Sequence, residues 1–222
     1  MYRELAFPPL ACLWVRVTAD ATTEVLPDGC SDLIWQAGRG AFVAGPDTGP
    51  VPSTAAPGTV LVGARFRPGA GGAALGLPLS ELCDLRVDLE DLRPDLAERL
   101  PAELDRREAV RRLAEIGAAA APADAAVVEA ARRLERPETR VERLADDLGL
   151  SERQLRRRCH AAVGYGPKTL QRVLRFRRFL AAADRDLARA ALDAGYADQS
   201  HLTRECTRLA GQPPAALLAA RA

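Results

Sequence analysis

Histidine is scarce in this chain of 222 residues, which holds only His160 and His201. Both lie in the C-terminal third, so the N-terminal half has no histidine-ligated metal centre. The sequence also lacks G-x-S-x-G and any phosphate-binding loop. Asp28 and Asp32 form the one candidate acid pair, but aspartates beside turns are usually structural. We therefore expect no catalytic residue, no metal and no cofactor, and predict that the protein is not an enzyme.

Cysteine and long apolar runs are also limited. The five cysteines are odd in number, scattered and without C-x-x-C, which favours reduced thiols over a disulfide framework or a zinc knuckle. No apolar run approaches the roughly 18 residues of a transmembrane helix, and the N-terminus does not resemble a signal peptide. The sequence therefore predicts a cytoplasmic protein without a membrane partner.

Lysine is almost absent, since Lys168 is the only one, and the net charge of +1 hides an uneven distribution. Residues 137–222 hold 16 Lys and Arg against 10 Asp and Glu, whereas residues 1–136 hold 15 against 20. A basic part joined to an acidic part indicates that only the C-terminal part meets a polyanion.

An internal repeat with an offset of 47 residues organises the basic part. Each copy has a glycine, then a Ser or Asp at an N-cap position, then a helix of basic and polar residues, which is typical of a helix-turn-helix. The matched pairs are Ser151 and Asp198, Leu155 and Leu202, Cys159 and Cys206, Gly164 and Gly211, and Pro167 and Pro214.

The outward faces of the two repeated helices suit DNA. Helical spacing places three arginines on one face of 151–164, opposite a buried stripe, and arginine reads guanine bidentately in the major groove. A solvated charged face is the alternative for one helix alone, but a second helix at 198–211 also presents hydrogen-bonding groups. The predicted DNA-binding residues are Arg153, Arg156, Arg157, Gln199, Ser200, Thr203 and Arg204.

A long helix at 168–183 is predicted to join the two copies. Its arginines are either phosphate contacts or solvent-facing residues, and they are Arg172, Arg175, Arg177 and Arg178. Sixteen helical residues span about 24 Å, and adjacent major-groove faces lie about 34 Å apart. Turns at each end would supply the remaining distance.

The N-terminal part is predicted to be rich in strands. Period-2 alternation at 59–67 is the clearest strand signal, and shorter apolar runs lie at 10–17, 22–26, 32–36 and 40–44 between Gly and Pro turns. These patterns predict an α+β protein: a small β-barrel or sandwich at 1–77, a helical linker or dimerisation segment at 78–136, and an all-α double helix-turn-helix at 137–222.

The C-terminal 85 or so residues resemble the AraC/XylS-type transcription regulators. The matching pieces are Leu144-Ala145-(x2)-Leu148-Gly149-Leu150-Ser151-(x3)-Leu155-(x)-Arg157, Gly164-(x2)-Pro167, Ala194-Gly195-Tyr196-(x)-Asp198-Gln199-Ser200-His201-Leu202-(x)-Arg204 and Gly211-Gln212-Pro213-Pro214. The resemblance implies two helix-turn-helix motifs on double-stranded DNA, with base contacts from the outward helices. Cys159 and Cys206 stand where the family usually has Phe, so we expect looser packing there.

The N-terminal half is similar to the sensor half of one branch of that family. Its matching pieces are Pro27-Asp28-Gly29-Cys30-Ser31-Asp32-Leu33-Ile34-Trp35, Val43-Ala44-Gly45-Pro46-Asp47 and Gly63-Ala64-Arg65-Phe66-Arg67-Pro68-Gly69. The resemblance implies a cupin-like β-barrel that binds a small effector or mediates dimerisation. The residues expected at an effector pocket are Trp14, Trp35, Arg65, Phe66 and Arg67.

These observations favour an effector-responsive transcription factor. Two alternatives stay open: a regulator that responds to thiol chemistry or a soft metal through Cys30, and a non-catalytic small-molecule binding protein. The expected partners are double-stranded DNA and a small effector of unknown identity. RNA polymerase and a second copy of the chain are further candidate partners.

Overall fold

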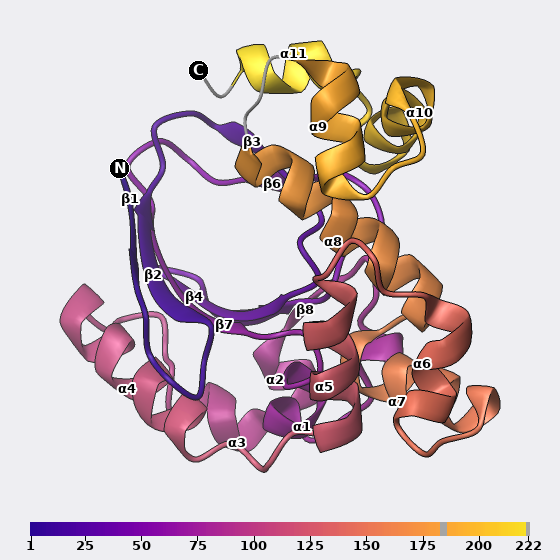
Figure 1. The fold of residues 1–222 in the computed structure, drawn as a ribbon. Helices are drawn as coiled ribbons and strands as arrows, with labels where there is room; N and C mark the ends of the chain where they lie inside the picture. Colours follow the sequence, from indigo (N-terminus) through magenta and orange to yellow (C-terminus); the bar gives the residue numbers. More distant parts are fainter. Residues whose placement is uncertain (183–185, 221–222) are drawn as a thin grey trace.

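The fold is α+β, as predicted, with a bent antiparallel sheet in the N-terminal part and a bundle of helices in the C-terminal part (Figure 1). The computed structural model describes residues 1–182 and 186–220. In that part of the chain no helix is long and apolar enough to cross a membrane.

In the described part of the chain, eight strands form two separate sheets. The larger sheet has six antiparallel strands in the order β1-β2-β7-β4-β5-β8, and the smaller one pairs β3 with β6. Their bounds are β1 Tyr2–Leu5, β2 Cys12–Val17, β3 Thr22–Val25, β4 Ser31–Gln36, β5 Gly40–Ala44, β6 Val51–Thr54, β7 Val60–Phe66 and β8 Arg86–Asp88.

The two-sheet alternative is correct, and the closed barrel is wrong. Closure would require the edge strands β1 and β8 to pair, but among the described residues β1 pairs only with β2 and β8 only with β5. Instead, β3 and β6 lie across the concave side of the larger sheet (Figure 1). Three of these strands were not predicted: β1 and β8 were overlooked, and β6 lies in a stretch that reads as a loop.

The larger sheet has two chemically different faces. Alternation along β7 places Val62, Ala64 and Phe66 in one hydrophobic core, together with Leu33 and Trp35 of β4. The opposite face carries the alternate residues of these strands. One face therefore packs against helices, while the other carries polar side chains beside a small hydrophobic cluster. That cluster consists of Cys12, Trp14, Ile34, Phe42, Ala44 and Leu61.

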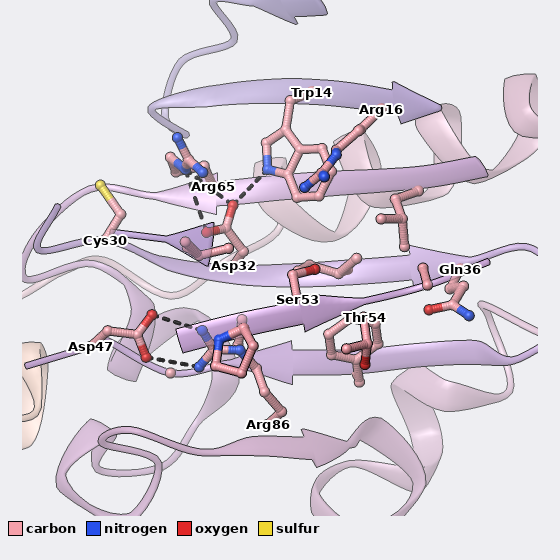
Figure 2. A pocket seen from close by; sticks show the side chains of 18 of the residues that line it. Trp14, Arg16, Cys30, Asp32, Gln36, Asp47, Ser53, Thr54, Arg65 and Arg86 are labelled. Atoms are coloured by element: carbon pink, nitrogen blue, oxygen red, sulfur yellow. Dashed lines mark hydrogen bonds and ion pairs between the residues drawn. The ribbon is translucent and has the colours of Figure 1, made fainter. Parts of the chain in front are cut away.

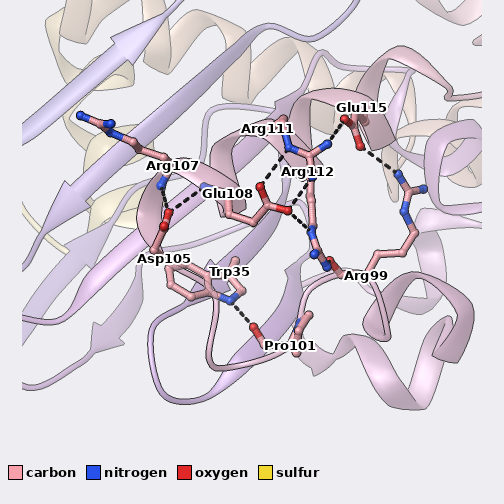
Figure 3. A network of polar contacts seen from close by, with 9 residues as sticks. All are labelled: Trp35, Arg99, Pro101, Asp105, Arg107, Glu108, Arg111, Arg112 and Glu115. Carbon is pink, nitrogen blue, oxygen red and sulfur yellow. Dashed lines mark hydrogen bonds and ion pairs between the residues drawn. The ribbon is translucent and has the colours of Figure 1, made fainter.

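The helix-packed face is covered mainly by α4 (Arg106–Ala118), which contacts β7 and β2. The carboxylate of Asp105 caps α4 by accepting from the backbone N–H groups of Arg107 and Glu108, and Glu108 pairs with Arg111 and Arg112 (Figure 3). Beside this helix the Trp35 indole Nε1 donates to the Pro101 carbonyl at 2.8 Å. The shorter elements here are α1 Gly71–Leu75, η1 Leu79–Glu81, α2 Leu89–Leu92 and α3 Pro94–Ala97.

Replacing Trp35 by Phe tests this anchor. Trp35 is 1 % exposed, so the change leaves a void and an unpaired Pro101 carbonyl. We expect the free energy of unfolding in urea to fall by about 2–4 kcal/mol. Leu192→Ala, at a position that is 62 % exposed, is the control and should change it by less than about 0.5 kcal/mol. A loss for Trp35→Phe as small as the control's would contradict the anchoring role.

The C-terminal helices share a second hydrophobic core, to which α8 contributes Leu170, Val173, Leu174, Phe176 and Phe179. The predicted helices agree closely with those observed, although the predicted end of α8 at residue 183 lies outside the described residues. The bounds are α5 Ala125–Leu134, α6 Val141–Asp147, α7 Glu152–Val163, α8 Pro167–Ala182, α9 Leu187–Ala194, α10 Gln199–Ala210 and α11 Pro214–Ala219.

Along the sequence, the boundary between the two cores falls between α4 and α5. Ile116 belongs to the core of the sheet, whereas Val127, Ala130 and Leu134 of α5 belong to the core of the C-terminal bundle. Helix α5 therefore packs with the repeat, although the sequence pattern places it in the linker segment. The division into residues 1–77, 78–136 and 137–222 stays a prediction.

Candidate nucleic-acid interface and effector cavity

Helix α7 is fixed at both ends by its own sequence. Ser151 and Gln154 form a capping box, in which the Ser151 hydroxyl accepts from the Gln154 backbone N–H and the Gln154 side chain accepts from the Ser151 N–H. Gly164 ends the helix with φ of 92°, in the left-handed region that favours glycine. The exposed side chains of α7 therefore project from a rigid element.

The three predicted arginines of α7 share an exposed face. Arg153, Arg156 and Arg157 are exposed, while Leu155 and Cys159 are buried in the bundle core. Within the described residues, none of the three has a carboxylate within 4.0 Å, whereas the next residue, Arg158, lies 3.6 Å from Asp124. Three unneutralised guanidinium groups on one face are suited to bind phosphates and guanine edges.

Helix α10 repeats this arrangement with different chemistry. The carboxylate of Asp198 caps it by accepting from the His201 backbone N–H at 2.6 Å. Gln199, Ser200 and Arg204 are exposed, and Thr203 is half-buried with its hydroxyl donating to the Gln199 carbonyl. The outward face of α10 thus offers mainly neutral hydrogen-bonding groups.

Two arginines of α8 form ion pairs, and two others have buried nitrogen atoms. Arg172 pairs with Glu205 at 2.7 Å, and Arg177 pairs with Glu135 and donates to the Asp28 carbonyl at 3.3 Å. Nε of Arg175 and both Nη atoms of Arg178 are buried. Among the described arginines of this domain, those on α7 are therefore better placed to contact DNA than those on α8.

A cavity of about 270 Å³ lies between the two sheets, on the face of the larger sheet that is turned away from the helices (Figure 2). Strand register arranges that face in three rows. Cys12, Arg65, Asp32 and Ala44 form the first, Trp14, Gly63, Ile34 and Phe42 the second, and Arg16, Leu61 and Gln36 the third. Ser53 and Thr54 of β6 line the opposite wall. An apolar row between two polar rows suits a small ligand with an apolar body and polar ends.

Gly63 creates room for the indole at the centre of this face. A Cβ at Gly63 would lie 2.1 Å from the Trp14 ring, so the ring packs directly on the backbone of β7. The Trp14 Nε1 donates to Asp32 Oδ1 at 2.6 Å, and Arg65 Nε donates to the same oxygen at 3.1 Å. A second ion pair, between Arg86 and Asp47, closes another side of the cavity (Figure 2).

The buried carboxyl of Asp32 has an unusual acidity. Burial raises its pKa to about 6, although the Arg65 guanidinium and the Trp14 hydrogen bond oppose the rise. The folded protein therefore retains a proton on Asp32 at pH values where the unfolded chain has lost it. This contribution to stability is complete below the unfolded pKa of Asp32 and is lost as pH rises from there through the folded pKa.

Comparing the wild type with Asp32→Asn at several pH values tests this assignment. Between pH 5 and pH 7.5 the wild type should lose about 1–1.5 kcal/mol of unfolding free energy relative to the variant, because the Asp32 proton dissociates in the folded state. Urea unfolding across this range measures the difference. Parallel pH profiles for the two proteins would show that Asp32 titrates normally.

The structure places only two of the five predicted effector residues at the cavity, namely Trp14 and Arg65. Trp35 and Phe66 lie in the core on the other face, and Arg67 is exposed with its Nε 3.4 Å from the Leu10 carbonyl. Trp35 and Phe66 do not line the cavity, because alternate residues of a strand face opposite sides. Arg67 follows Phe66, the last residue of β7, and so lies beyond the strand. The sequence reasoning missed Arg16, Gln36 and Arg86 as lining residues, although applying the same alternation to β4 would have indicated Gln36.

Cys30 lines the cavity but is a poor candidate for a reactive thiol. It is buried, and this burial raises its pKa well above the usual range, with further increases from Asp28 and Asp32. A thiol held in its protonated form reacts slowly with oxidants and electrophiles. Within the described residues, no cluster of three or more His, Cys, Asp or Glu side chains could hold a metal ion.

Comparison with known families gives one match in the C-terminal part of the chain and another in the N-terminal part. Residues 144–220 match a family described as helix-turn-helix domain, and residues 8–88 match a domain of unknown function (DUF6597). The C-terminal domain is of the AraC type, so the resemblance to AraC/XylS-type regulators is confirmed. Regulators with this domain are in general not enzymes.

The solved structures to which the chain is similar include two of ToxT from Vibrio cholerae. One, from O395, is 9% identical with a TM-score of 0.49, covering 98% of this chain and 96% of that chain. The other, a P21 crystal form, is 8% identical with a TM-score of 0.46, covering 98% and 97%. No curated protein matches the chain. The helix-turn-helix match, rather than these distant structures, identifies the C-terminal part as the DNA-binding domain of a transcription regulator.

Proposed function

We propose that this protein, which carries an AraC-type helix-turn-helix domain, regulates transcription in the cytoplasm by binding one DNA site through both α7 and α10. The repeated, capped helices with unneutralised arginines on α7 support the proposal most strongly. Helix α8 holds the two helices in one bundle, and its 16 residues span about 24 Å, so tilt or DNA bending would bring both into successive major grooves.

The DNA contacts are proposed residue by residue. Arg153, Arg156 and Arg157 would contact one half of the site, and Gln199, Ser200, Thr203 and Arg204 would contact the other. Retention of genomic fragments by the purified protein at two salt concentrations tests DNA recognition. Selective retention that weakens steeply with salt supports the proposal. Unselective binding at both concentrations contradicts it.

Arg157→Ala tests the role of one arginine. If Arg157 reads a base bidentately, its loss should weaken specific binding by about 1–3 kcal/mol and leave binding to random DNA much less affected. Arg158→Ala is the matched control, because Arg158 is adjacent on α7 but lies beside Asp124. Equal losses on specific and random DNA would assign Arg157 to a phosphate instead.

We also propose that a small organic effector binds between the two sheets and alters DNA binding. The cavity's position between two sheets, its apolar middle row and the polar side chains of its flanking rows support this role. The burial of Cys30 makes the thiol-based alternative weaker. RNA polymerase and a second copy of the chain stay predicted partners.

A thermal-shift screen of small metabolites, followed by a cavity-filling variant, tests the effector site. Ser53→Phe places a ring in the cavity from β6, whereas Thr22→Phe places one on exposed β3, outside the cavity. A ligand at 100 times its Kd should stabilise the wild type by about 2.7 kcal/mol, and Ser53→Phe should lose this shift. Retention of the full shift by Ser53→Phe, or its equal loss in Thr22→Phe, would place the ligand elsewhere.

A further inference from the structure

The turn formed by residues 27–30 lies between the cavity and the DNA-binding bundle. On the cavity side, Asp28 and Cys30 line the wall, and the Asp28 carboxylate lies 3.6 Å from the Arg65 guanidinium. Arg65 also binds Asp32 of β4 at 3.1 Å. The turn is thus joined to the polar network of the cavity through one arginine.

The other side of the same turn rests on α8. Gly29 has φ of 86°, and a Cβ at this position would lie 3.4 Å from Leu170 Cδ1 and 3.8 Å from Leu174 Cδ2. Arg177, one turn further along α8, donates to the Asp28 carbonyl at 3.3 Å. The backbone of the turn therefore packs on the helix that connects the two recognition helices.

Asp28 holds the turn together from within. Its Oδ1 accepts from the Cys30 backbone N–H at 2.8 Å, while its Oδ2 faces Arg65. Both oxygens of one carboxylate are therefore used, one for the shape of the turn and one for its link to the cavity. A change in the partners of Arg65 alters the charge balance at the residue that shapes the turn.

The contact between the two parts extends to the end of α7. A Cβ at Gly72 of α1 would lie 2.8 Å from the Ala161 carbonyl oxygen, and one at Gly164 would lie 2.6 Å from Pro46. Tyr165, in the connection from α7 to α8, is buried, and its hydroxyl has no hydrogen-bond partner among the described residues. Arg153, Arg156 and Arg157 stay exposed, so this packing leaves their face of α7 free.

We propose that the 27–30 turn transmits the state of the cavity to α8, with Arg65 holding it on the cavity side and Arg177 on the helix side. A ligand that changes the partners of Arg65 alters the packing of Gly29 on Leu170 and Leu174. This shifts the helix that sets the relative positions of α7 and α10. The regulatory meaning rests on the proposed function, but the mechanical coupling does not require DNA.

Hydrogen–deuterium exchange of the full chain without DNA tests this coupling from the cavity side. Arg65→Gln should speed amide exchange by about fivefold in the 27–30 turn and in the facing segment of α8, residues 170–177. The matched control is Arg39→Gln, because Arg39 lines the same cavity but pairs with Asp88. The control should leave exchange in α8 unchanged.

Coupling is reciprocal, so the test is repeated from the helix side. Arg177→Gln should speed exchange in the 27–30 turn and at the start of β4. Arg172→Gln on the same helix, which loses only the pair with Glu205, should not. Arg177 is partly exposed, so this variant keeps the test valid if Arg65→Gln fails to fold.

The exchange experiments distinguish transmission through the turn from purely local effects of the substitutions. Faster exchange on both sides of the turn in both variants supports transmission. Changes confined to the substituted side, or equal changes in the controls, overturn it. Because the measurement needs no DNA, a negative result would leave selective DNA retention intact, whereas a failure of the proposed function would appear as unselective retention by the wild type.

Discussion

The burial of the apolar stripe of α8 is the interaction on which the C-terminal structure depends. Leu170, Val173, Leu174, Phe176 and Phe179 are at most 2 % exposed and pack against helices from both copies of the repeat. A single helix thereby fixes α7 and α10 in one core. The same side of the molecule receives the 27–30 turn, so the packing that orients the recognition helices also contacts the N-terminal part.

In the N-terminal part, strand alternation separates stability from ligand chemistry. The face that carries Trp35 and Phe66 is packed against helices, and the face that carries Trp14, Asp32 and Arg65 borders the cavity. Substitutions on the second face can change the chemistry of the cavity while the helix-packed core stays intact. This division explains how a sheet of modest size supports both a rigid core and a polar interior site.

Local patterns predicted much of the fold. Turn residues and alternation located five strands, and N-caps, glycine C-caps and apolar spacing located the helices of the repeat. Strands β1 and β6 were missed because their signals depend on partners: all four residues of β1 are exposed, and Pro52 interrupts β6. The open arrangement of the two sheets and the membership of α5 in the C-terminal core depend on tertiary packing, which sequence periodicity does not encode.

The candidate sites were predictable to different degrees. Helical spacing after the Ser151 N-cap predicts that three arginines of α7 share one outward face. In the structure these three side chains are exposed. The cavity residues come from strands β1 to β8 and from the segments that connect them, so only the register between strands shows which of them meet. The sequence assigns aromatic residues to the effector pocket by residue type alone. Trp35 and Phe66 lie on the face of the sheet opposite the cavity.

The two copies of the repeat differ in chemistry, because α7 presents three arginines and α10 presents mainly neutral groups. If α7 and α10 bind one DNA site as proposed, a single copy of the chain has no two-fold symmetry to match a palindromic site. The proposed site is then directional, and reversing it relative to a promoter would turn the whole protein around. The N-terminal part would then face the opposite way along the DNA, and any protein that it meets there would differ.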